Sequence, residues 1–310
     1  MSPIPFLSND GFVNNPFPDD PAEEAAALLR LADTGPDRFR THPVPSGLLR
    51  LYGGQIVAQA LGAMRLTVPS GKVAHALHLF YQRPGLTDRP LDLAVERDTD
   101  GRSFAQRRVA VTQDGAPVAY AMASFQVPES SGLHQDPMPD VPGPADLPPL
   151  ARFFADNLAD VPDRQRPFWC RRQMFDWRPV EPFHLGPITP MPARRHFWFR
   201  AQVPFTDSPE MHQTLLAYAS DTHIIQGGLR PMGIAWDDAH LQISSLDHAV
   251  WFHQPCRVDD WLLYVIDSPV ASGSRVLGTG TIHARDGTLV ATVVQQGLAR
   301  MLDAPREGKI

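Results

Sequence analysis

Asp221 is the first residue of this chain whose surroundings suggest chemistry. It stands in a mostly apolar stretch, residues 211–225, whose pattern predicts a helix with Asp221 deep inside it. A carboxylate on such a surface loses hydration, which is costly unless the group is hydrogen-bonded or takes part in proton transfer. In the alternative interpretation, Asp221 points outward beside Gln213 and Thr214.

Gln295 and Ser245 are the next candidates. The alternation from Leu289 to Gly297 places the Gln295 amide on the apolar face of a strand. A buried amide needs several hydrogen-bond partners, so a core glutamine bonded to the backbone is the simpler interpretation of this residue taken alone. Ser245 stands at a strand entrance, where serine is usually a turn or edge residue.

Other catalytic patterns are missing from the sequence. Asp247 and His248 are adjacent on a predicted strand, so their side chains point to opposite faces, and we interpret the histidines as structural. The chain contains no HExxH, GxSxG, P-loop or GxGxxG motif and no metal-ligand spacing of cysteine and histidine. We therefore expect neither a catalytic metal nor a bound cofactor. The pair Gly53–Gly54 is interpreted as allowing a close helix approach.

Two stretches of the chain follow the same pattern. HALHLFYQRPGLTD at 75–88 and SLDHAVWFHQPCRVDD at 245–260 are each followed by alternating strands and an Asp-Gly turn. Pro84 corresponds to Pro255 and Asp114 to Asp286, and these two pairs are separated by almost the same length of chain. This match suggests a duplication. Because the candidate residues lie in the second copy, the first is interpreted as a degenerate partner.

Each copy is predicted to consist of a helix followed by antiparallel strands. Helices are expected at 22–33, 56–66, 150–161 and 211–225, and strands at 37–44, 75–83, 90–99, 103–113, 119–127, 197–205, 243–254, 261–268, 274–284 and 289–300. Seven prolines at 128–149 indicate an extended connector. The expected domains are an N-terminal extension at 1–19, a first domain at 20–127, a linker at 128–150 and a second domain at 151–310.

Composition limits the classes of partner. With 310 residues, 43% of them hydrophobic, the chain is long enough for two domains with their own cores. A net charge of −6 argues against a nucleic-acid scaffold, and three arginine pairs (residues 107–108, 171–172 and 194–195) receive no role. Because the sequence has two cysteines, no secretory signal pattern and no apolar run of membrane-spanning length, we expect a cytoplasmic protein without a membrane partner.

Over residues 20–302 the chain resembles the acyl-CoA thioesterase II family. The matching text is YGGQIVAQAL and HALHLFYQRPG in the first half, and FDWRPVEP, FWFRA, LLAYASDTHII, LDHAVWFHQP, DDWLLY and DGTLVATVVQQGLAR in the second. The resemblance implies an α+β double hotdog fold: two antiparallel sheets, each wrapped around a long central helix, joined by the proline-rich linker. We expect the two copies to pair into one continuous sheet with both helices beneath it and the acyl chain between them.

The resemblance also implies the site and the reaction. The family's catalytic aspartate, threonine or serine, and glutamine fall on Asp221, Ser245 and Gln295. The implied activity is hydrolysis of acyl-CoA by direct attack of a water molecule that these three residues hold, without a cofactor and with backbone amides polarising the carbonyl. The alternatives are a hotdog hydratase acting on enoyl or hydroxyacyl thioesters and a non-catalytic acyl-CoA-binding protein. Association into homo-oligomers is compatible with the resemblance, and acyl-chain preference stays open.

Overall fold

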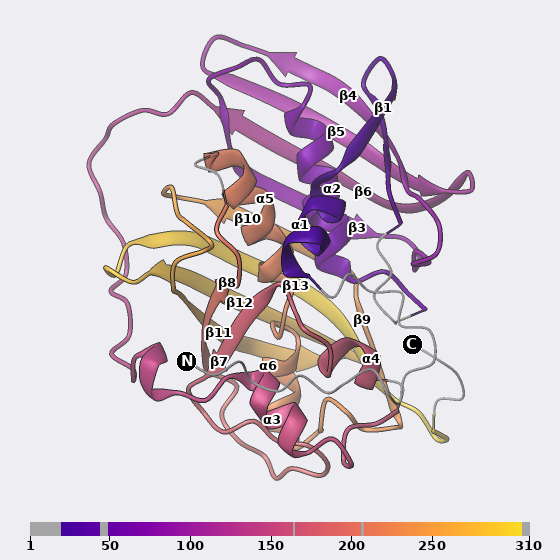
Figure 1. Ribbon diagram of the computed structural model, residues 1–310, viewed down its shortest axis with the longest axis vertical. Helices are drawn as coiled ribbons and strands as arrows, with labels where there is room; N and C mark the ends of the chain where they lie inside the picture. Colours follow the sequence, from indigo (N-terminus) through magenta and orange to yellow (C-terminus); the bar gives the residue numbers. More distant parts are fainter. Residues whose placement is uncertain (1–19, 44–48, 164, 206–207, 306–310) are drawn as a thin grey trace.

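The computed structural model describes residues 20–43, 49–163, 165–205 and 208–305 (Figure 1). The predicted N-terminal extension at 1–19 lies outside the described residues, and the domain boundaries stay a prediction. The first half contains α1 (Pro21–Leu29), β1 (Leu31–Gly35), β2 (Arg38–Thr41), α2 (Gly53–Arg65), β3 (Val73–Tyr81), β4 (Asp92–Asp100), β5 (Phe104–Gln113) and β6 (Ala116–Gln126).

The second half repeats this order of elements with additions. It contains the short helix η1 (Pro144–Asp146), α3 (Leu150–Asp156), α4 (Arg166–Trp169), β7 (Phe175–Pro179), β8 (Arg195–Ala201), α5 (Pro209–Ser220), α6 (Gln226–Leu229), η2 (Arg230–Met232), β9 (Leu241–Ser245), β10 (Asp247–Phe252), β11 (Leu262–Ser272), β12 (Arg275–Ala284) and β13 (Leu289–Met301). All ten predicted strands overlap observed ones. The predicted helix at 22–33 ends at Leu29 because the chain turns into β1, and the predicted helix at 150–161 ends at Asp156.

The sheets of the two halves form one antiparallel sheet of 13 strands. Its order is β1-β2-β4-β5-β6-β3-β10-β13-β12-β11-β8-β7, with β9 also pairing β13. The expectation of two sheets is therefore wrong, whereas the expected pairing of the two copies is confirmed. The physical reason is that β3 and β10 would each leave an edge of unpaired N–H and C=O groups, and their pairing satisfies both edges.

The register of this junction agrees with the duplication. His78 lies directly opposite Ala249, and these two residues are separated by the same length of chain as Pro84 and Pro255. A residue therefore faces its own counterpart in the other copy, as at a local twofold axis. Outward from the junction, β3, β6, β5 and β4 correspond in order to β10, β13, β12 and β11.

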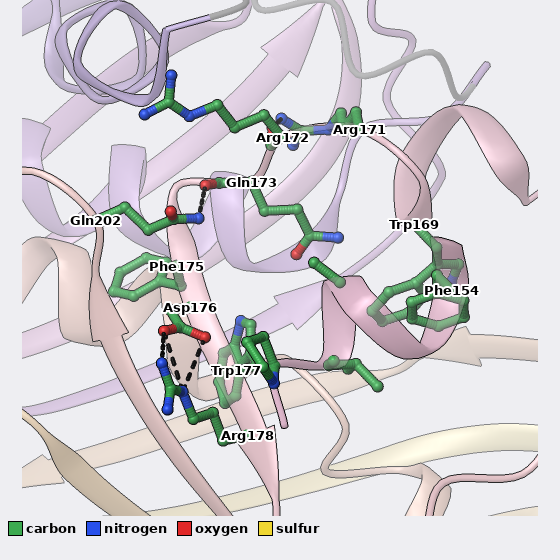
Figure 2. Close-up of a pocket in the computed structure, with 13 residues that line it drawn as sticks. Phe154, Trp169, Arg171, Arg172, Gln173, Phe175, Asp176, Trp177, Arg178 and Gln202 are labelled. Carbon is green, nitrogen blue, oxygen red and sulfur yellow. Dashed lines mark hydrogen bonds and ion pairs between the residues drawn. The ribbon is translucent and has the colours of Figure 1, made fainter. Parts of the chain in front are cut away.

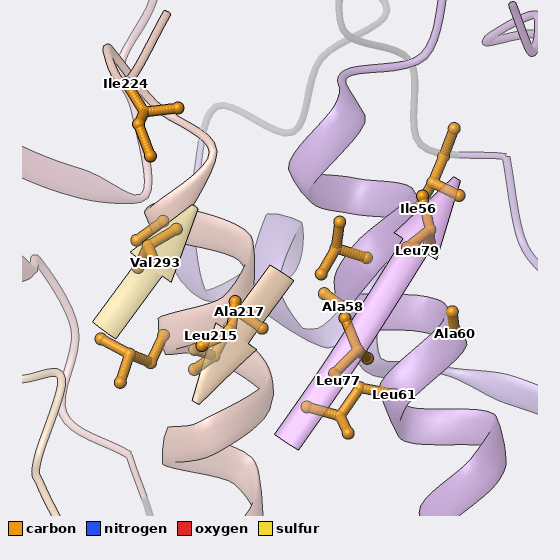
Figure 3. Close-up of a cluster of buried hydrophobic side chains, with 14 of the residues drawn as sticks. Ile56, Ala58, Ala60, Leu61, Leu77, Leu79, Leu215, Ala217, Ile224 and Val293 are labelled. Carbon is orange, nitrogen blue, oxygen red and sulfur yellow. The ribbon is translucent and has the colours of Figure 1, made fainter. Parts of the chain in front are cut away.

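Helices α2 and α5 lie side by side on one face of the sheet (Figure 1). Their 13 and 12 residues make them helices of ordinary length, so the expectation of long central helices is not met. Apolar side chains of both helices meet those of the central strands in the core shown in Figure 3, among them Ile56, Leu61, Leu77, Leu79, Leu215, Ala217 and Val293. The close approach expected at Gly53–Gly54 is confirmed, because a Cβ on Gly54 would clash with the backbone carbonyl oxygen of Tyr218 in α5.

The C-terminal end of α5 differs from the prediction. The helix ends at Ser220 and Asp221 is its C-cap, so Asp221 does not lie deep inside a helix. His223 follows with φ of 68°, a left-handed conformation that stops a right-handed helix. Ile224 and Ile225 are buried even though they follow the end of the helix. Their apolar side chains therefore extended the helical pattern of the sequence beyond the true helix end. This end places the Asp221 carboxylate at the boundary between the two halves.

Candidate active site

Pairing of β9 with β13 explains how Ser245 and Gln295 come together. Ser245 is the last residue of β9 and lies opposite Gly297. Gln295 is two residues before Gly297, so its side chain is on the same face of β13 and diagonal to Ser245. A Cβ on Gly297 would lie 2.5 Å from the Ile225 side chain, so a larger residue here would require Ile225, in the segment that follows Asp221, to move.

The structure brings all three sequence-predicted residues into contact. The Gln295 amide Nε2 donates to Ser245 Oγ at 2.7 Å, and Ser245 Oγ lies 3.5 Å from Asp221 Oδ1, oriented to donate to it. The Gln295 side chain is fully buried, and the Asp221 side chain is 5% exposed. The polar groups therefore form a connected row that ends on a carboxylate.

His248 belongs to this row, and the sequence interpretation of it as a merely structural residue missed that connection. Its Nδ1 lies 2.6 Å from Gln295 Oε1, and its Nε2 lies 2.8 Å from Ser220 Oγ. Burial lowers the pKa of His248 although the charge of Asp221 opposes the shift, so the ring is neutral. Because Gln295 Oε1 only accepts, the proton of the neutral ring lies on Nδ1.

The first half also supplies groups to the site. The Gly54 amide at the start of α2 donates to Asp221 Oδ2 at 2.8 Å, so the positive end of this helix faces the carboxylate. The Tyr52 hydroxyl is 2.7 Å from Thr222 Oγ1. The Tyr81 hydroxyl is buried and has no hydrogen-bond partner among the described residues. The first copy is therefore more than a degenerate partner, because Asp221 is held from both halves.

A cavity of about 220 Å³ opens beside the row of polar groups. Asp221 and Ser245 form part of its wall. The rest is mainly apolar and aromatic, with Tyr52, Phe168, Trp169, Ile225, Trp236 and Ile243 among the lining residues. An apolar chain fits such walls, and a water molecule between Asp221 and Ser245 would meet a proton acceptor and a hydroxyl.

A second cavity of about 110 Å³ lies next to the first and shares Trp169 with it (Figure 2). Two of its arginines already meet carboxylates: Arg171 is paired with Glu24 at 2.7 Å and Arg178 with Asp176 at 3.0 Å. In the part of the chain that the structure describes, no three His, Cys, Asp or Glu side chains gather as metal ligands. No helix within the described ranges is long and apolar enough to span a membrane.

Comparisons with known proteins agree with this architecture. A family model described as acyl-CoA thioesterase matches residues 182–298, and one described as acyl-CoA thioesterase N-terminal domain matches residues 40–126. Acyl-CoA thioesterase 2 of Haemophilus influenzae is 33% identical over 88% of this chain and 96% of its own length. Human acyl-coenzyme A thioesterase 8 is 34% identical over 91% of both chains.

Solved structures give the same result. The acyl-CoA thioesterase II of Mycobacterium marinum superposes with a TM-score of 0.73 and 33% identity, over 90% of this chain and 99% of that one. A protein from Alicyclobacillus acidocaldarius that is described as having a hot dog fold gives a TM-score of 0.71 at 22% identity, which supports the fold alone. With both halves matched in order and the two relatives similar along nearly the whole length, the chain belongs to the acyl-CoA thioesterase family.

Proposed function

We propose that the protein hydrolyses acyl-CoA to a free carboxylic acid and CoA by direct attack of a water molecule that Asp221, Ser245 and Gln295 position. The observation that carries this proposal is the place of Asp221 and Ser245 in the wall of an apolar cavity, connected to the buried amide of Gln295. A thioester needs this combination, because its acyl chain is apolar while its carbonyl carbon must meet an activated water.

In the proposed reaction the water oxygen attacks the thioester carbonyl carbon while Asp221 accepts a proton from the water. The tetrahedral intermediate then collapses, the carbon–sulfur bond breaks, and the CoA thiolate takes up the proton. Ser245 orients the water, and Gln295 fixes the Ser245 hydroxyl through its 2.7 Å hydrogen bond. Because water attacks the carbonyl carbon directly, no acyl-enzyme intermediate forms. A thiolate needs little acid assistance to leave, so no second acid is required.

A hotdog hydratase is the rival enzyme, and it would need an Asp/His pair that acts on the substrate. His248 Nδ1 is 3.9 Å from Asp221 Oδ1, but both ring nitrogens already contact Gln295 and Ser220. His248 is also fully buried, which speaks for a positioning role. A non-catalytic acyl-CoA-binding protein would retain the cavity without needing the row of polar groups.

Asp221→Asn tests the proposal, because asparagine keeps the shape and loses the proton acceptor. We expect kcat for CoA release from a saturated acyl-CoA, followed with a thiol reagent, to fall by about 10²- to 10⁴-fold with an unchanged melting temperature. The matched control is Asp247→Asn, since the Asp247 carboxylate accepts a hydrogen bond from the backbone N–H of Gln296 and lies outside the cavity wall. It should retain kcat within about twofold.

Each rival predicts a different result. Near-normal kcat in Asp221→Asn would remove Asp221 from the proton-accepting role. Turnover of enoyl-CoA without CoA release from the saturated thioester would favour the hydratase. Stabilisation of the wild-type protein by acyl-CoA without any turnover would favour the binding protein.

A further inference from the structure

A third cavity, with about 30 Å³ of room, lies next to the candidate active site. Gln226 and Trp236 line both cavities. Most of its wall is apolar, from Phe183, Ile188, Leu229, Ile234 and Ala235, but Arg195 and Arg230 also face it. The room is enough for one or two groups the size of a water molecule.

Arg195 is unusual because it is a buried guanidinium with no ion-pair partner among the described residues. It is 5% exposed, and its Nε has no hydrogen-bond partner within the described ranges. Its NH2 group donates only to the carbonyl oxygens of Glu181 and Pro182, at 3.2 and 3.4 Å. The Phe183 and Phe197 rings lie 5.1 and 4.5 Å from the guanidinium carbon, and this contact replaces only part of the lost hydration.

Arg230 adds a second positive charge to the same cavity. Its Nε donates to the Pro192 carbonyl oxygen at 2.9 Å, and no described carboxylate lies within ion-pair distance of either guanidinium. The acid that acts on both arginines is Glu181, but its carboxylate already accepts from the His196 amide and contacts the His196 ring. Within the described part of the chain, the cavity therefore holds two positive charges and no paired anion.

Electrostatics at neighbouring groups agrees with this excess of positive charge. Burial and the Arg230 field lower the pKa of Arg195 to about 9, which leaves it charged at neutral pH. Burial and the same two arginines lower the pKa of His184, which also lines the cavity. In contrast, the arginines of the cavity in Figure 2 that face Glu24 and Asp176 are already neutralised.

We infer that Arg195 and Arg230 form a binding site for an anionic oxygen group carried by the thioester substrate. This inference rests on the proposed hydrolysis. Two parts of an acyl-CoA have the required chemistry: a carboxylate at the far end of a dicarboxylic acyl chain, and the phosphates of CoA. Planar guanidinium groups bind both through charge-assisted hydrogen bonds. The shared residues Gln226 and Trp236 place this site within the reach of a ligand in the larger cavity.

Three thioesters distinguish the two sources of the anion. Octanoyl-CoA carries the phosphates alone, suberoyl-CoA adds a terminal carboxylate on a chain of the same length, and octanoyl-pantetheine has neither. Arg230→Gln removes one charge at a half-buried position. Arg194→Gln is the matched control, because Arg194 is 66% exposed, is paired with Asp267 and does not line the cavity.

If the site takes the carboxylate, Arg230→Gln should lower kcat/KM for suberoyl-CoA by roughly 10- to 100-fold and leave octanoyl-CoA within about twofold. If the site takes a phosphate, Arg230→Gln should lower kcat/KM by this factor for both CoA esters and leave kcat/KM for octanoyl-pantetheine unchanged. In either case Arg230→Lys, which keeps the charge, should lower kcat/KM for the affected thioester less than Arg230→Gln does.

Equal effects of Arg230→Gln on all three thioesters, whether as small as those of Arg194→Gln or uniformly large, would overturn the inference. Absence of turnover in the wild-type protein would instead count against the proposed hydrolysis. In that case calorimetric titration with intact octanoyl-CoA and suberoyl-CoA tests the anion site. If the site exists, Arg230→Gln must bind at least one of these two thioesters more weakly than the wild-type protein does.

Discussion

The hydrogen bonds from His248 to Asp221 run in one direction along the row of polar groups. His248 Nδ1–H donates to Gln295 Oε1, Gln295 Nε2 donates to Ser245 Oγ, and the Ser245 hydroxyl points to Asp221. Chains of this kind polarise each bond along them, and the chain fixes the orientation of the Gln295 amide. The row ends on Asp221 Oδ1, so the Ser245 hydroxyl that we propose to orient the water is held between the Gln295 amide and the Asp221 carboxylate.

His223, two residues after Asp221, makes stability depend on pH. It is stacked on Phe197 at 4.4 Å and on Trp169 at 5.4 Å. Burial, with the Arg195 charge, lowers its pKa to about 3 from an ordinary 6.5. As pH falls, the His223 ring is therefore protonated in the unfolded chain before it is protonated in the folded one. The stability gained by burying the neutral ring is complete above about pH 6.5 and is lost as pH falls from there towards 3.

Replacement of His223 by asparagine, which tolerates the left-handed conformation, should remove this dependence. Between pH 6 and 4 the free energy of unfolding should fall less steeply in His223→Asn than in the wild type, by about 1.4 kcal/mol per pH unit. Urea titrations at several pH values measure the slope. The exposed His134 serves as control, and the same slope in His223→Asn, His134→Asn and the wild type would contradict the assignment.

Part of the site was predictable residue by residue. Alternation placed Gln295 on a buried face, and the quoted motifs placed Asp221 and Ser245. The sequence analysis put Asp247 and His248 on opposite faces of the strand without assigning His248 to the inner one. In the structure His248 is buried on the same face as Val250 and Phe252, and its hydrogen bond to Gln295 depends on how β10 and β13 are paired. Sequence patterns give the face of a strand and leave its neighbour in the sheet open.

At the scale of elements, the start of α2 determines where Asp221 lies. A Cβ on Gly53 would be 2.8 Å from Asp221 Oδ2 and 2.9 Å from the Tyr81 hydroxyl. The Asp221 carboxylate and the Tyr81 hydroxyl thus both approach the position that a Cβ on residue 53 would occupy. Glycine, which has no Cβ, leaves this position free. The helix was recognisable from its apolar pattern, but its contact with Asp221 joins segments from the two halves of the chain, which local patterns do not report.

Gly53→Ala should therefore displace Asp221 and lower kcat for acyl-CoA hydrolysis by roughly tenfold or more, since small misplacements of a reacting group cost up to about 10². Gly62→Ala is the control on the same helix, because its Cβ would lie 3.6 Å from Leu31 and meets no hindrance. That variant should be fully active and more stable by about 0.5–1 kcal/mol. Equal activity of the two alanine variants would show that the approach of α2 does not position the carboxylate.

The end of α5 was the element that sequence patterns located least well. Apolar residues continued through Ile225, so the pattern extended the helix past Asp221. The turn after Ser220 depends on the conformation of His223, which the surrounding aromatic rings hold in place. Periodicity records which residues are buried, and both a helix and the irregular segment after it can bury the same residue types.

At the scale of the whole molecule, the β3–β10 junction and the contact between α2 and α5 join the two halves. The duplication in the sequence predicted that the two copies would pair. The expectation of two separate sheets was wrong because it treated the sheet of each copy as complete. A strand edge is satisfied by any suitable partner, so copy-by-copy patterns leave the joining undetermined. Association of whole chains into homo-oligomers and a cytoplasmic location stay predictions.

The joined sheet also predicts that the halves unfold together, and the sequence provides a test. All six tryptophans lie between Trp169 and Trp261, so their fluorescence reports on the second half, whereas far-UV circular dichroism reports on both. Leu93→Ala opens a cavity in β4 of the first half, where Leu93 is 1% exposed. Truncation of a buried leucine costs about 2–5 kcal/mol, and a single cooperative unit must lose this stability everywhere.

In urea we therefore expect the fluorescence and circular dichroism curves of the wild-type protein to coincide. Both curves should shift to lower urea by the same amount in Leu93→Ala. Thr279→Ala, a change at a partly exposed position in β12, controls for substitution in the half that carries the tryptophans and should leave both midpoints almost unchanged. A fluorescence midpoint that stays in place while the dichroism curve splits in Leu93→Ala would mean that the first half unfolds alone. Because Gly54 donates to Asp221, such independent unfolding would also break the candidate site before the second half had lost its structure.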